Sequence, residues 1–232
     1  PNDERVVLQK TANECVKGDT TSTKQYLNKL KSNQTLDVET LDYAEDVLAS
    51  SKGNDILVTH GVKDSYGVLY HQLNSTTTLS KPLIVSLELL RSPDYQKLLS
   101  KKGVLFPSSN QIDTDYFKTF CVLNSDKKIA ISLTLPLDYL KPISAYAVPY
   151  GLVLLTGAQK ELCLSDLEKL WASKLNKRNL TVHKSEQAKN YAKNYSPSQK
   201  LLDRYEQQKL AYPYMKAPRK LNPHKNKKII SD

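Results

Sequence analysis

The fold is decided by the stretch 55-DILVTHGVKDSYGVLYHQL-73, which is followed by 82-PLIVSL-87 and 92-SPDYQKLL-99. DILVTH and PLIVSL are short, apolar and β-branched, as strands are, and each leads into a run with helical spacing of apolar residues. Asp64 and Ser92 are suitable helix N-caps, and Pro93 stands where a first helical turn tolerates a missing N–H. A strand, a helix and a second buried strand in this order predict a βαβ unit with parallel strands.

The remaining chain extends this pattern in both directions. Apolar residues recur at helical spacing in residues 4–16, 23–31, 38–48, 113–123, 136–141 and 164–175. Two further strands are predicted at residues 128–135 and 150–156. We therefore predict an α/β fold with a mostly parallel sheet of about four strands flanked by helices, an N-terminal helical segment and a basic C-terminal extension.

Three regions follow from this pattern. Residues 1–50 are expected to be helices that pack on the core, residues 51–173 an α/β domain, and residues 174–232 a basic tail, first helical and then extended. A chain of 232 residues with 39% hydrophobic residues can bury one sizeable core. The uncharged stretch at residues 142–158 is interrupted by proline and glycine and is too short to cross a bilayer, so we predict no transmembrane span.

The motifs of common enzyme classes are missing from the sequence. It has only 7 glycines, and neither GxGxxG nor GxxxxGK[ST] occurs, which argues against a nucleotide enzyme. The 4 histidines lack HxxxH or HExxH spacing, and Cys15, Cys121 and Cys163 are far apart and are expected to be buried or partly buried free thiols. GxSxG is absent. We predict no catalytic residues, no metal and no cofactor.

The charge is concentrated at one end of the chain. Residues 174–232 contain 15 Lys and Arg against 4 Asp and Glu, whereas the whole chain has a net charge of +10. Like-charged, proline-containing tails are often solvated termini, but this one also carries tyrosines that offer contact area. The residues that we expect to bind a partner are Arg204, Tyr205, Tyr212, Tyr214, Arg219, Lys220 and Lys225.

Four blocks within residues 41–156 resemble a known family. The segment 57-LVTHGVKDSYGVLYHQ-72 is similar to "ILFTNGDNDTFPLWYLQ" of large multi-pass membrane proteins of Bacteroidota related to protein O-mannosyltransferases, and 84-IVSLELLRSPDY-95 is similar to their "VVNLSLLNTPWYI". The segments 131-ISLTLPLDYL-140 and 151-GLVLL-155 resemble two later blocks in the same order. In that family this region is the soluble domain after the membrane part, and the sugar-transfer chemistry is expected in the membrane part. The resemblance therefore implies a cell-envelope protein without transferase activity of its own.

A ligand site, if the domain has one, is expected at Gly61, Asp64 and Tyr66, because α/β domains place ligands at the carboxyl ends of parallel strands. The alternative is structural: Asp64 caps the next helix and Gly61 supplies a positive φ. The sequence also departs from the family motif, with Val62 at a second acidic position and Tyr66 and Gly67 in place of Phe-Pro.

These observations give a leading function and two alternatives. The leading hypothesis is a non-catalytic interaction subunit of a bacterial cell-envelope assembly, periplasmic or outer-membrane-associated, that docks on a protein partner through its C-terminal tail. An anionic membrane surface is a further candidate partner, and a cytoplasmic location stays open. The first alternative is an accessory factor of protein O-glycosylation that binds a glycan or an acceptor peptide. The second, binding of nucleic acid or the ribosome, is ranked last because no RNA-binding signature accompanies the charge.

Overall fold

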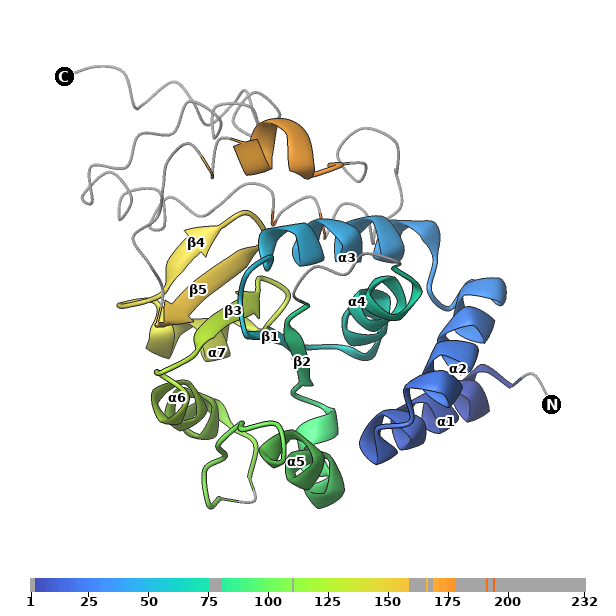
Figure 1. Ribbon diagram of the computed structural model, residues 1–232, viewed down its shortest axis with the longest axis horizontal. Helices are drawn as coiled ribbons and strands as arrows, with labels where there is room; N and C mark the ends of the chain where they lie inside the picture. Colours follow the sequence, from blue (N-terminus) through green and yellow to red (C-terminus); the bar gives the residue numbers. More distant parts are fainter. Residues whose placement is uncertain are drawn as a thin grey trace.

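A computed structural model of the chain shows a five-stranded sheet between two layers of helices (Figure 1). The structure describes residues 3–75, 81–109, 111–158, 166, 169–177, 191 and 194. The strands are β1 (Ile56–Thr59), β2 (Leu83–Ser86), β3 (Lys128–Ser132), β4 (Val148–Tyr150) and β5 (Val153–Gly157). They lie in the order β2-β1-β3-β5-β4.

The parallel half of the sheet is the predicted βαβ unit. β1 pairs in parallel with β2 on one side and with β3 on the other. β5 runs antiparallel to both β3 and β4, so the sheet is mixed, with five strands instead of about four. β4 contains Pro149, which cannot donate to a sheet ladder, and β4 lies at the sheet edge, where proline is tolerated. The α/β class is confirmed, and the expectation of a mostly parallel sheet holds for three of the five strands.

One face of the sheet is covered by α3 (Val38–Ser50), α4 (Val62–Asn74) and the π-helical turn η3 (Leu170–Lys174). Side chains alternate between the two faces of a strand, and Leu57 of β1, Ala130 of β3 and Leu155 of β5 all point to this side. They form a core there with Tyr43 of α3 and Trp171 of η3. The C-terminal part of the described chain therefore belongs to this layer.

The other face is covered by α5 (Pro93–Ser100), α6 (Thr114–Leu123) and α7 (Leu137–Leu140), with short 3-10 turns η1 (Leu89–Arg91) and η2 (Lys141–Ile143) beside them. This core contains Val58, Ile131, Phe117 and Phe120, among others. As predicted, Pro93 occupies the first turn of α5 and Ser92 precedes it as the N-cap residue.

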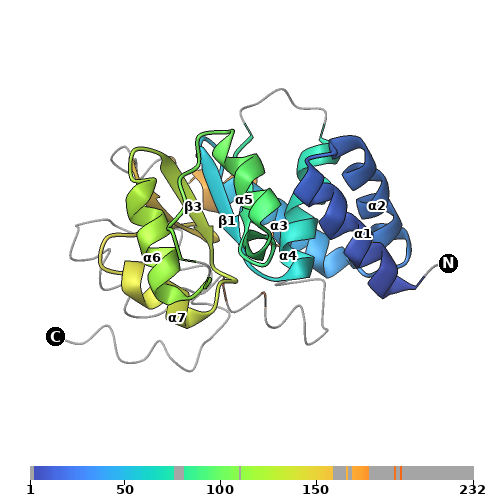
Figure 2. The same ribbon diagram turned by 90° about the horizontal axis from the view of Figure 1, so that it is seen from below.

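α1 (Glu4–Lys17) and α2 (Thr20–Ser32) form a helical pair beside α4 (Figure 2). Gly18 ends α1 in the left-handed conformation, with φ of 76°. The aspartates that cap α1, α2, α3 and α6 each accept a hydrogen bond from a backbone N–H of the first turn; they are Asp3, Asp19, Asp37 and Asp113.

None of the helices in the described ranges is long and apolar enough to cross a membrane. Cys15 is partly buried and Cys121 is buried, as expected for free thiols, and Cys163 lies outside the described residues. Burial raises the pKa of the Cys121 thiol to about 12 and that of the Cys15 thiol to about 11. Neither thiol is therefore activated as a nucleophile.

Candidate binding site

The candidate site lies at the carboxyl ends of the three parallel strands β1, β2 and β3. After β1 the chain enters α4 on one face of the sheet; after β2 it passes through α5 and α6 on the other face before β3 pairs with the far side of β1. The edge between β1 and β3 is therefore a topological switch point. Ligands of open α/β sheets bind in the crevice at such a point, so this edge is where a ligand is expected first.

Gly61 makes the turn from β1 into α4. It has φ of 89° and ψ of 136°, a conformation that favours glycine, as the sequence predicted. Gly61 is itself the N-cap residue of α4, so the expectation that Asp64 caps this helix is wrong. Asp64 lies in the first helical turn instead, where a negative charge is favourable, and a Cβ atom placed on Gly61 would be 3.5 Å from its Oδ2 atom.

Glu88 lies beside the Gly61 turn. Its Oε1 atom accepts a short hydrogen bond from the Gly61 N–H, and its Oε2 atom accepts one from Ser86 Oγ at 3.1 Å. His60 Nε2 is 3.5 Å from Glu88 Oε1, and the two side chains are 36% and 31% exposed, respectively. A solvent-facing carboxylate beside an imidazole can accept and donate hydrogen bonds to a polar ligand.

The floor of the site is a chain of buried hydroxyls. Thr59 Oγ1 is 2.9 Å from Ser65 Oγ, which donates to Ser86 Oγ at 3.0 Å, and Ser86 in turn reaches Glu88. Because Thr59, Ser65 and Ser86 come from β1, α4 and β2, the chain ties these three elements together beneath Glu88. Such a satisfied polar network fixes the geometry of the carboxylate above it.

Asp64 is a partly buried carboxylate with two hydroxyl partners, Tyr191 and Thr134. The Tyr191 phenol donates to Asp64 Oδ1 at 2.8 Å, and Thr134 comes from the loop after β3. Burial raises the pKa of the Asp64 carboxyl to about 6, although these two hydrogen bonds act in the opposite direction. Asp64 is therefore an acceptor for hydroxyl groups at neutral pH and becomes protonated in mildly acidic solution.

Tyr191 brings the C-terminal region to the switch point. Its ring stacks on the ring of Tyr43 in α3, with centroids 4.2 Å apart and an interplanar angle of 10°. Asn194 Nδ2 donates to the Tyr43 hydroxyl at 2.8 Å, and the Tyr191 hydroxyl also lies 3.4 Å from Thr40 Oγ1. Tyr43 and Tyr191 are 1% and 3% exposed, so this stacked pair is a core contact and not a surface one.

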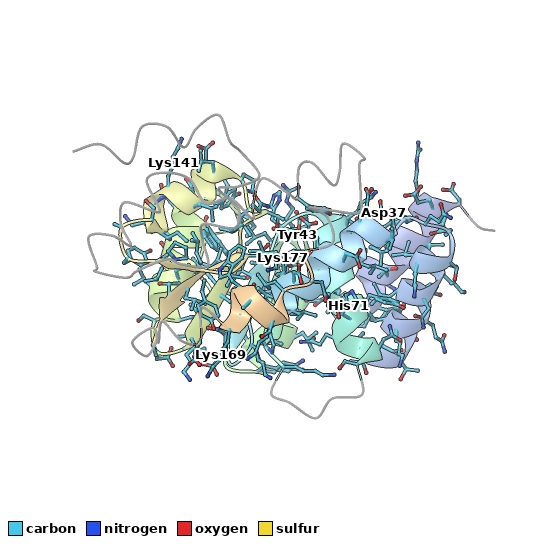
Figure 3. All side chains as sticks on the ribbon, turned by 90° about the horizontal axis from the view of Figure 1, so that it is seen from above. Asp37, Tyr43, His71, Lys141, Lys169 and Lys177 are labelled. Atoms are coloured by element: carbon cyan, nitrogen blue, oxygen red, sulfur yellow. The ribbon has the colours of Figure 1, made fainter. Side chains whose placement is uncertain are left out.

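A second attachment of the C-terminal region lies further along α3. Asp46 is fully buried, and its two carboxylate oxygens accept the backbone N–H groups of Asn176 and Lys177 at 2.6 and 2.8 Å. Asn176 Nδ2 also donates to Glu45 Oε2 at 2.7 Å. Figure 3 views this side of the molecule and labels Tyr43 and Lys177, which mark where the chain after η3 meets α3.

α3 differs in charge from the region that it receives. It carries four acidic residues and no lysine or arginine; they are Glu39, Asp42, Glu45 and Asp46. Residues 174–232, which begin at this contact, have 15 basic against 4 acidic residues. α3 and the sequence of residues 174–232 thus carry opposite net charge.

The structure brings together two of the three predicted ligand residues. Gly61 and Asp64 lie at the switch point, but Tyr66 is on the opposite side of α4, buried against α1 and α2, where its hydroxyl is 3.4 Å from the carbonyl oxygen of Leu8. Tyr66 is therefore not part of this site. The residues predicted to bind a partner, from Arg204 to Lys225, lie outside the described residues.

Sequence reasoning missed several members of the site, among them Glu88, Thr134, Tyr43 and Tyr191. Glu88 stands two residues after β2, a position from which the strand pattern alone could have placed it at the carboxyl ends of the strands. Thr134 follows β3 in the same way. Tyr43 and Tyr191 carried no such signal, because nothing local connects residues of α3 with the C-terminal region.

Two hollows lie away from the switch point, along the outer side of α3. One has a volume of about 620 Å³ and the other about 510 Å³, and Lys31, Glu45, Tyr70 and His71 line both. His71 is held by a 2.8 Å contact between its Nε2 atom and the Leu41 carbonyl oxygen. In the described part of the chain, no group of three or more His, Cys, Asp or Glu side chains could hold a metal ion.

Comparisons of the chain with protein-family models, with curated proteins and with solved structures gave no match. The likeness to the Bacteroidota membrane family thus stays a prediction from the sequence.

Proposed function

We propose that this chain is a non-catalytic interaction subunit of a bacterial cell-envelope assembly, periplasmic or outer-membrane-associated, whose basic C-terminal region binds a protein partner. The α/β domain supplies a rigid base, and the C-terminal region supplies the charge and the tyrosines. The envelope location rests on the sequence resemblance alone.

The observation that carries this proposal is the attachment of the C-terminal region to α3. Asp46 holds the backbone at Asn176 and Lys177, and Tyr43 and Asp64 hold Tyr191. The basic region therefore starts from fixed points on the domain. A region that starts from a fixed surface loses less freedom on binding than a free tail, so it is suited to partner contact.

The two described histidines each contact a group other than a nucleophile. His60 contacts Glu88, and His71 contacts the carbonyl oxygen of Leu41. In neither contact does the imidazole face a serine or a cysteine, so the nucleophile–base pair of covalent catalysis is not assembled by these two side chains.

The test is capture of partners from the envelope fraction of the native organism. The full chain is compared with a variant that lacks residues 211–232, which follow the attachment points Asn176, Lys177 and Tyr191 in the sequence. We expect the deletion to remove the captured proteins while the thermal unfolding midpoint of the domain changes little. Equal capture by both chains would overturn the proposal.

Two substitution sets separate the contributions within this region. Tyr212→Ala with Tyr214→Ala removes aromatic contact area, and Arg219→Glu with Lys220→Glu and Lys225→Glu reverses charge. Because salt screens charge but not apolar burial, we expect capture by the tyrosine variant to be more sensitive to added salt than capture by the unmodified chain. Any capture that the charge-reversed variant retains should be less sensitive to added salt than capture by the unmodified chain.

A second candidate function is favoured by one feature beside the switch point. Glu88 and His60 remain about one-third exposed above a fixed hydroxyl floor, which suits the hydroxyl groups of a glycan or of an acceptor peptide. Titration with a mannosylated serine- and threonine-containing peptide tests this role. We expect Glu88→Gln to weaken binding about tenfold, the effect of one charge-assisted hydrogen bond, with Glu39→Gln as the control. Equal affinity of the chain with and without Glu88→Gln would exclude it.

A further inference from the structure

Tyr191 and Asn194 contact α3 and α4 as a pair three residues apart, and both are in helical conformation. Residues at positions i and i+3 of a helix lie on one face, and both side chains contact the same surface. That surface consists of Thr40, Tyr43 and Asp64, which we call the tyrosine socket.

The tyrosine socket has separate contacts for the ring, the hydroxyl and the amide. The Tyr43 ring stacks on the ring of Tyr191, the Asp64 carboxylate accepts the phenol proton, and the Tyr43 hydroxyl accepts from Asn194. Phenylalanine at position 191 would keep the stack and lose the phenol hydrogen bond. Leucine would lose both, so the contacts distinguish tyrosine from other large side chains.

The sequence around this turn is a tandem repeat. Residues 188–195 read AKNYAKNY, so Tyr191 and Tyr195 occupy equivalent positions of two four-residue units. Three residues after Tyr195 stands Ser198, whose hydroxyl can donate a hydrogen bond as the Asn194 amide does. Pro197 disfavours a helical turn after Tyr195, so Tyr191 with Asn194 is the pair of this repeat that suits the socket.

We propose that the tyrosine socket is a peptide-binding site for a helical turn of the form Tyr-x-x-Asn, filled by the chain's own Tyr191 and Asn194 and able to exchange them for the same turn supplied by a partner. This inference rests on the proposed function, because it says how the C-terminal region is held and released. A partner that presents such a turn takes the socket, and residues beyond Lys177 then lose their second attachment to α3.

Exchange depends on the tether between the two attachments. Asp46 holds the chain at Lys177, and residues 178–190 connect this point to Tyr191. A short tether keeps the attached turn at an effective concentration of about millimolar, so a free peptide competes poorly with it. Binding in trans should therefore be measurable once the chain's own turn is disabled.

The test uses the full chain with Tyr191→Ala, Asn194→Ala and Tyr195→Ala. These substitutions remove the pair that fills the socket and the neighbouring tyrosine that could replace Tyr191. The probe is a fluorescently labelled peptide of the sequence AKNYAKNY, blocked at both ends, and its binding is followed by anisotropy. We expect saturable binding to this variant and binding at least about tenfold weaker to the unmodified chain, whose own turn competes.

Two controls identify the contacts. A peptide with both tyrosines replaced by phenylalanine, and the same protein variant with Asp64→Ala added, should each bind about tenfold more weakly, because each lacks the phenol–carboxylate hydrogen bond. Absence of saturable binding, or equal binding of the phenylalanine peptide, would overturn the inference.

A milder variant guards against loss of folding in the triple variant. Tyr191→Phe alone keeps the buried ring but weakens the attached turn, so we expect it to bind the tyrosine peptide more tightly than the unmodified chain does. Equal affinity of the two would contradict exchange at this socket. None of these measurements involves a cellular partner. Failure of the peptide to bind would therefore not affect the partner-capture test of the proposed function, and failure of partner capture would not affect the peptide measurement.

Discussion

The phenol of Tyr191 donates a 2.8 Å hydrogen bond to the carboxylate of Asp64, which lies 127 positions earlier in the chain. This contact joins the C-terminal region to the first turn of α4, at the switch point of the sheet. The site where an α/β fold is expected to bind a ligand thus already contains a side chain of the protein itself.

The raised pKa of Asp64 predicts a specific pH dependence of stability. Its value of about 6 in the folded chain exceeds the ordinary 3.8, so the folded state binds the proton more tightly than the unfolded state does. The free energy of unfolding should therefore fall as pH rises from about 4 to about 6, by on the order of 1–2 kcal/mol. Denaturant unfolding at a series of pH values measures this change.

Asp64→Asn provides the control for that experiment. The variant keeps a hydrogen-bond acceptor for Tyr191 but has no titrating group at this position. We expect the difference between the two stability curves to follow a titration centred between the two pKa values, while all other groups cancel. If the difference in the free energy of unfolding between the two proteins is constant from pH 4 to pH 7, the pKa of Asp64 is not raised.

Asp46→Ala should loosen the chain after η3. The substitution removes two hydrogen bonds from the backbone N–H groups of Asn176 and Lys177 to a charged acceptor, at a cost of about 1–3 kcal/mol. Limited trypsin digestion should therefore cleave after Lys177 faster than in the unmodified chain. Glu45→Ala is the matched control; its effect should be smaller, because Glu45 contacts the side chain of Asn176 and not the backbone. Equal cleavage rates in the two variants would contradict this role of Asp46.

Alanine substitution of two glycines distinguishes the cost of backbone strain from the cost of a steric clash. Gly53 and Gly157 both have positive φ, of 84° and 80°, but a Cβ atom on Gly53 would meet nothing within 4 Å, whereas one on Gly157 would be 2.0 Å from the Lys127 carbonyl oxygen. Gly53→Ala should cost about 1 kcal/mol, the strain of the left-handed conformation. Gly157→Ala should cost at least about 2 kcal/mol more, because the clashing atom is backbone. Equal unfolding midpoints of the two variants would show that this clash is relieved.

Much of the fold could be predicted from local sequence, and part of the site could not. The β-branched runs that became β1 and β2, with Gly61 and Pro93 after them, identify the βαβ unit because each signal is local. β4 was missed because its three residues include Pro149, which is unusual in a strand and is tolerated only at an edge. The contact of Tyr43 with Tyr191 depends on how distant segments pack, and no local periodicity encodes it.

The start of α4 shows a second limit of prediction from the sequence. An aspartate three residues after a glycine is compatible with a cap, and equally with a charge in the first turn. Only the backbone of Gly61, with its positive φ and its N–H directed at Glu88, fixes where the helix begins. Once the helix begins at Val62, Asp64 is left available to accept the phenol of Tyr191.

The most direct test of the account is a double-mutant cycle between Tyr191→Phe and Asp64→Asn at pH 7. Each change alters one partner of the hydrogen bond and preserves the shape of the side chain, so the coupling energy isolates their interaction. The account predicts a favourable coupling of about 1 kcal/mol in the free energy of unfolding, the scale of a buried hydrogen bond that changes from a charged to a neutral acceptor. Additive effects of the two substitutions would contradict the claim that the C-terminal region is held at Asp64.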